Sequence, residues 1–103
     1  LKMHLAGVFI SNFVNYLIGL SYNIAKPNHT LLLPLAIETV RKAFLTGHPF
    51  NVQTGPAIRE DYNTIKMHKI LLDQLFPEND DNHKIIYDII TNSIVMSKKK
   101  FKK

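Results

Sequence analysis

The sequence predicts an all-α protein, a helical bundle with one long, mostly buried helix at its N-terminus. Apolar residues make up 46% of the 103 residues, as in ordinary folded domains. In several segments they recur at three- and four-residue spacing, the period of an amphipathic helix. No segment alternates between apolar and polar residues as a half-buried strand does. We therefore expect four helices joined by connectors that carry proline, glycine or asparagine.

The first predicted helix covers residues 2–26 and ends at Pro27. Residues 5–25 carry no charge, and this length is sufficient to span a bilayer. Amides and hydroxyls are costly at that depth, so burial in a bundle or a dimer interface is favoured over a membrane span. The polar side chains of this run are Ser11, Asn12, Asn15, Ser21 and Asn23.

The second predicted helix covers residues 30–46, with Thr30 as its N-cap and Pro34 near its first turn. Gly47 stops it, and residues 48–60 show no periodicity and form a loop.

Asp61 is expected to cap a third helix that runs to about Phe76, with an apolar stripe that includes His68. A turn-rich connector then leads to a fourth helix over residues 82–97.

The net charge of +5 arises from the last six residues, which hold five of the 13 basic side chains. The remaining eight basic residues balance eight acidic ones. We therefore divide the chain into a helical domain, 1–97, and a solvated lysine-rich tail, 98–103. Neither a nucleic acid nor a membrane is predicted as a partner.

The absence of cysteine excludes disulfides and thiolate metal sites and is compatible with a cytoplasmic location. No signal-peptide pattern precedes the first helix, which begins directly inside a helical pattern. This start favours a fragment of a longer protein.

The first helix carries a polar stripe. His4, Ser11 and Asn15 are spaced i, i+7, i+11, with Asn12 beside them. In one interpretation these groups bond to one another or across a dimer axis, because buried amides need partners. In the other, the stripe faces a cleft and holds a substrate.

The loop before the third helix offers a second candidate site. Gly55 permits a close backbone approach, Gln53 and Thr54 bring polar side chains, and Arg59 has a fork suited to carboxylate or phosphate. Alternatively, Arg59 pairs with a neighbouring carboxylate and the other two only stabilise the turn. The five histidines have no metal-ligand spacing, so no metal is expected.

Several of these residues resemble one family. They are the run 4–13, Leu33-Pro34-Leu35 with Glu38-Thr39 and Lys42-Ala43, then Gln53-Thr54-Gly55-Pro56-Ala57 with Arg59, Asp61, Thr64 and His68. The match, over about His4 to Ile94, is to the C-terminal domain of unknown function of Rossmann-like NADP-dependent oxidoreductases from bacteria.

The resemblance implies a preceding nucleotide-binding domain that holds most of the NADP. It also implies kinship to pyrroline-5-carboxylate reductase, the β-hydroxyacid dehydrogenases and other enzymes like 6-phosphogluconate dehydrogenase, whose C-terminal helical domain forms the dimer. The β-hydroxyacid dehydrogenases carry a catalytic lysine and asparagine on the first helix of that domain. Asn12 or Asn15 matches the asparagine, but no lysine stands one turn before either.

We therefore expect the dimerising, substrate-side domain of an NADP-dependent oxidoreductase, acting on a small molecule and not catalytic alone. The catalytic candidates are His68 and His4. The substrate-binding candidates are Asn12, Asn15, Gln53, Thr54, Gly55 and Arg59. The alternative is a non-catalytic helical dimerisation or binding module.

Overall fold

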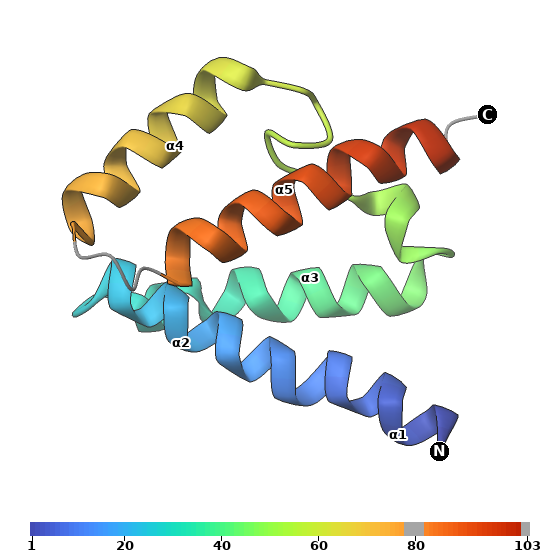
Figure 1. Ribbon diagram of the computed structural model, residues 1–103. Coiled ribbons are helices and arrows are strands. Elements are labelled where there is room, and N and C mark those ends of the chain that lie inside the picture. The colour runs from blue at the N-terminus through green and yellow to red at the C-terminus, as the bar shows by residue number, and fades with distance from the viewer. Residues whose placement is uncertain (78–81, 102–103) are drawn as a thin grey trace. The chain divides into compact units, whose positions relative to one another are not determined.

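The computed structural model describes residues 1–77 and 82–101, and all regular structure in these ranges is helical (Figure 1). The chain forms two compact units, residues 1–38 and 39–103. The all-α prediction is confirmed, with four long helical segments. In chain order the elements are α1 (Lys2–Gly7), η1 (Val8–Phe13), α2 (Val14–Ala25), η2 (His29–Leu32), α3 (Leu33–Leu45), η3 (Pro49–Val52), α4 (Tyr62–Leu75) and α5 (Asn82–Phe101).

The elements α1, η1 and α2 form one continuous helix of 24 residues in the first unit. None of its residues is buried in the single chain, and Phe9 is 61% exposed. The predicted burial of this helix is therefore wrong for the chain by itself. Within the first unit, α2 packs against the short turn η2.

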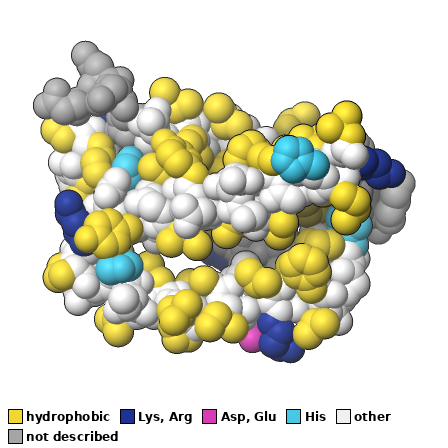
Figure 2. Space-filling view, turned by 90° about the horizontal axis from the view of Figure 1, so that it is seen from below, with side chains coloured by type: hydrophobic (Ala, Val, Ile, Leu, Met, Phe, Trp, Pro, Cys, Tyr) yellow, Lys and Arg dark blue, Asp and Glu magenta, His cyan; other side chains and the backbone are white. Residues whose placement is uncertain are grey.

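The same helix is long and apolar enough to cross a membrane, judged by length and composition alone. Its amides and hydroxyls oppose that role, because such groups are costly in hydrocarbon. Figure 2 shows how apolar side chains spread over one face of the molecule, with few charged groups among them.

The segment η1 is a π-helix, in which hydrogen bonds close wider turns than in an α-helix. The rings of Phe9 and Phe13 contact each other edge to face within it, with ring centroids 4.9 Å apart. A π turn is equivalent to one extra residue in an α-helix, so it shifts the angular position of everything beyond it. The predicted straight line through His4, Ser11 and Asn15 assumed an unbroken 3.6-residue repeat and is therefore interrupted.

The helix α3 starts later than the sequence predicts. Thr30 does not cap it, because this residue lies inside the 3₁₀ turn η2. Pro34 occupies the first turn of α3, where its missing N–H costs no intrahelical bond. Beyond the helix, Gly47 adopts the predicted left-handed conformation with φ of 97°.

The second unit contains the hairpin of α4 and α5. Ile65 and Leu72 on α4, together with Ala57 in the preceding loop, are the buried hydrophobic residues among those the structure describes. The α4 stripe is thus confirmed at two positions, whereas His68 is exposed.

The helix α5 continues to Phe101 rather than ending near Ser97. Lysine is a good helix former, and basic side chains favour the carboxyl end of a helix. The first tail residue, Lys98, is anchored by an ion pair to Glu60 with 2.9 Å between Nζ and Oε2. The tail residues Lys102 and Lys103 lie outside the described residues.

Gly55 provides a test of this fold. Its φ of 101° strains any residue that has a Cβ, although the space around it is open. We expect Gly55→Ala to lower the free energy of unfolding by about 1–2 kcal/mol. Urea denaturation followed by circular dichroism measures this change.

Gly19→Ala is the matched control, because Gly19 is helical and also has open space around it. The Gly19→Ala substitution should raise the free energy of unfolding by roughly 0.5–1 kcal/mol. Equal effects of the two substitutions would contradict the left-handed turn.

Candidate functional site

The loop before α4 is a tight turn that delivers Asp61 to the start of that helix. The backbone N–H of Asp61 donates to the Pro56 carbonyl at 2.9 Å, and that of Glu60 donates to the Ala57 carbonyl at 3.1 Å. Glu60 has a φ of 53°, in the left-handed region that non-glycine residues rarely adopt. The turn is therefore held by its own hydrogen bonds and by the burial of Ala57.

Contacts to Glu60 stabilise its unfavourable backbone conformation. Its carboxylate accepts a hydrogen bond from the Tyr62 hydroxyl at 3.2 Å and pairs with Lys98. Partial burial, and next the Glu60 carboxylate, raise the pKa of the Tyr62 phenol. This cluster joins the loop to both helices of the hairpin.

Asp61 is the N-cap of α4, as predicted. One carboxylate oxygen accepts from the Thr64 backbone N–H at 3.1 Å, and the other accepts from the Thr64 hydroxyl at 2.7 Å. These two hydrogen bonds are the main reason that the pKa of Asp61 lies below its ordinary value. Electrostatic interactions with Arg59 and then with His68 lower it further.

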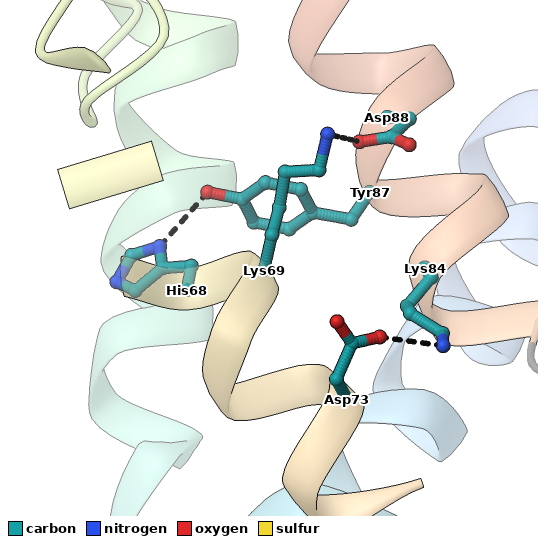
Figure 3. Close-up of polar contacts among 6 residues, drawn as sticks. All are labelled: His68, Lys69, Asp73, Lys84, Tyr87 and Asp88. Atoms are coloured by element: carbon teal, nitrogen blue, oxygen red, sulfur yellow. Dashed lines mark hydrogen bonds and ion pairs between the residues drawn. The ribbon is translucent and has the colours of Figure 1, made fainter. Parts of the chain in front are cut away.

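The exposed His68 is held by α5. Its Nδ1 lies 2.8 Å from the Tyr87 hydroxyl, and the two rings meet edge to face (Figure 3). Burial raises the pKa of the Tyr87 phenol, although a hydrogen bond from the Thr91 side chain acts in the opposite direction.

Two ion pairs extend this polar contact along the hairpin. The Lys69 Nζ lies 3.2 Å from the Asp88 Oδ1, and the Lys84 Nζ lies 2.6 Å from the Asp73 Oδ1 (Figure 3). All three cross-helix pairs fit one antiparallel register of α4 and α5. The charged pairs are partly exposed, so each contributes at most about 1 kcal/mol and mainly fixes this register.

The structure places some of the predicted site residues in the second unit. Arg59 and His68 both lie there, and each contributes to lowering the pKa of Asp61. Gln53 and Thr54 are exposed in the same unit, where the Gln53 amide donates to the Thr54 carbonyl at 3.3 Å. Gly55 forms the turn described above.

The other predicted residues lie in the first unit. His4, Asn12 and Asn15 are exposed there, and Asn12 lies inside the π-helical segment η1. These three residues and His68 therefore belong to different units.

Two features were missed by the sequence analysis. Tyr87 is 19 positions from its partner, and no local motif marks the pair. The signal available was the hairpin itself, since residues equally distant from a turn face each other across it. The π-helical segment has no recognisable signature in its residue types, yet such turns are frequent at functional sites.

The part of the chain that the structure describes contains no group of three metal-ligating side chains. A dinucleotide also fits poorly at the start of α4. The preceding loop has one glycine, and the Asp61 carboxylate occupies the helix end where a pyrophosphate would bind. These residues therefore do not form a cradle for NADP.

The fold and site define a small all-α domain in which a capped helix presents a tyrosine-anchored histidine. The chain belongs to the family described as a domain of unknown function (DUF2520), whose model matches residues 1–94. No curated protein and no solved structure matches the chain.

The Asp61 cap predicts a pH dependence of stability. Because folding lowers the pKa of Asp61, its stabilising effect is complete above the unfolded-state pKa and is lost as pH falls below about 4. We expect Asp61→Asn to retain the hydrogen bond from the Thr64 backbone and to reduce the acid-induced fall in melting temperature. Thermal melts between about pH 2 and 7 measure this.

Asp61→Ala is the companion variant, since it removes both acceptors. We expect it to lower the melting temperature by several degrees at neutral pH. Identical melting curves for the wild type and Asp61→Ala at pH 7 would show that the cap contributes nothing.

Proposed function

We propose that this chain is the dimerising, substrate-side domain of a cytoplasmic NADP-dependent oxidoreductase, whose nucleotide-binding domain is not part of this sequence. The observation that carries the dimerising role is the exposed apolar helix Lys2–Ala25. Family membership is compatible with this proposal, and the resemblance of the motif residues to the C-terminal domains of such enzymes supports it. The alternative is a dimerisation or binding module without catalysis.

The apolar surface supports a partner because a folded chain does not normally leave so much of it in water. Residues on successive turns of the long helix are about half exposed, among them Ile10, Phe13 and Ile18. The amides on the same helix favour a protein partner over lipid, because they can hydrogen-bond across an interface. A second copy of the chain offers the same apolar and amide groups in a self-complementary arrangement.

The substrate-side role is supported by the second unit. Arg59 supplies a guanidinium group suited to a carboxylate or phosphate, and His68 lies on α4 of the same unit. Gln53, Thr54 and the turn at Gly55 add polar groups from the same loop. His4, Asn12 and Asn15 are candidate residues of the first unit, and the NADP is held mainly by the nucleotide-binding domain.

Light scattering tests the dimer. We expect two copies per particle at micromolar concentration. A carboxylate introduced on the helix should raise the dissociation constant of the dimer at least about 100-fold, because burying an unpaired charge costs several kcal/mol. Phe13→Glu is suitable because Phe13 is 49% exposed in the single chain and its loss creates no cavity.

Met67→Glu is the matched control, since Met67 is 65% exposed on α4. It should remain dimeric. A monomeric wild type, or equal effects of the two substitutions, would contradict dimerisation through the N-terminal helix.

Calorimetric titration with NADPH tests the oxidoreductase assignment. The natural full-length protein should bind the cofactor, whereas this chain alone should not, because the described loop before α4 does not fit a dinucleotide. If the full-length protein fails to bind NADPH, the oxidoreductase assignment is wrong. The non-catalytic module then becomes the better account of the chain.

A further inference from the structure

Tyr87 on α5 holds one edge of the His68 ring. Its Nδ1 contacts the Tyr87 hydroxyl at 2.8 Å, and the edge-to-face contact of the two rings, at 87°, limits rotation of the imidazole. The second ring nitrogen, Nε2, points away from Tyr87 (Figure 3). His68 is an exposed residue.

A hydrogen bond between the Thr91 side chain and Tyr87 favours one direction for the contact with His68. Thr91 stands one turn further along α5, and its side chain hydrogen-bonds Tyr87. When the Thr91 hydroxyl donates to the phenol oxygen, the phenol hydrogen is directed at Nδ1 of His68. The phenol remains protonated at neutral pH, since burial raises its pKa.

A neutral imidazole that accepts a hydrogen bond at Nδ1 carries its own hydrogen at Nε2. With Tyr87 as the donor, the contact therefore selects one of the two tautomers of His68. The other charged groups around this pair are Asp61 and Lys69 on the α4 side, Asp88 on α5, and Arg59 in the loop.

We propose that Tyr87 is a positioning residue that fixes His68 as the Nε2–H tautomer, so that Nε2 donates a hydrogen bond to an oxygen of the bound substrate. A carbonyl or carboxylate oxygen is the acceptor chemistry that such a donor recognises. In this role His68 orients and polarises the oxygen and keeps its proton. The tautomer stands on the contacts within this chain, and only the substrate's part in the reaction rests on the proposed function.

Nitrogen-15 NMR of the histidine side chains in the full chain tests the proposal. At about pH 8.5, where an ordinary imidazole is neutral, free histidine is a mixture of tautomers. We expect His68 to be almost wholly Nε2–H in the wild type. Tyr87→Phe keeps the ring and removes the hydroxyl, and it should return His68 to the mixed values of the exposed His4 in the same spectrum.

Thr91→Val should produce a smaller shift in the same direction. Tyr62→Phe is the matched control, because it removes another tyrosine hydroxyl of the same unit and should leave His68 unchanged. Circular dichroism checks that each variant keeps its helix content. A proton on Nδ1 of wild-type His68, or no tautomer change in Tyr87→Phe, would overturn the positioning role.

Acetate is the probe for the oxygen acceptor, with sodium chloride as the ionic-strength control. We expect acetate to shift the Nε2 resonance of His68 in the wild type, with a markedly smaller effect in Tyr87→Phe. No acetate-specific shift would overturn the donor role. Either result is independent of NADPH binding by the full-length protein, so the two proposals fail separately.

Discussion

The constraint on which the rest of this structure depends is the shortage of buried apolar surface. Among the described residues, the buried hydrophobic side chains are Ala57, Ile65 and Leu72, all in the second unit. Ordering a backbone costs roughly 1–2 kcal/mol per residue, and apolar burial is the principal compensation. The exposed faces of the N-terminal helix and of α3 therefore need a covering surface if the chain is to hold its fold.

In the second unit, hydrogen bonds and ion pairs compensate for the small hydrophobic core. The Asp61 cap, the Glu60 cluster and the cross-helix pairs fix the start of α4 and its register with α5. Each of these contacts is individually weak at an exposed position. Together they orient His68 and Tyr87, so the groups that support the hairpin also define its candidate site.

Features set by nearby residues could be predicted from the sequence. The helix ends at Pro27 and Gly47 and the cap at Asp61 follow from proline geometry, from left-handed glycine and from a side-chain acceptor. The Tyr87 contact could not, because it depends on how two helices fold back on each other. The burial of the first helix was predicted from composition, but burial depends on neighbours that composition does not specify.

The π-helical segment η1 also has a consequence for chain geometry. An α-helix advances about 100° per residue, so one residue more or fewer in this segment rotates α1 by that angle about α2. A domain fused ahead of Lys2 would turn with it. The number of residues in η1 thus determines the rotation of α1 about the helix axis. Deletion of one residue there would rotate the preceding polypeptide and leave α2 in place.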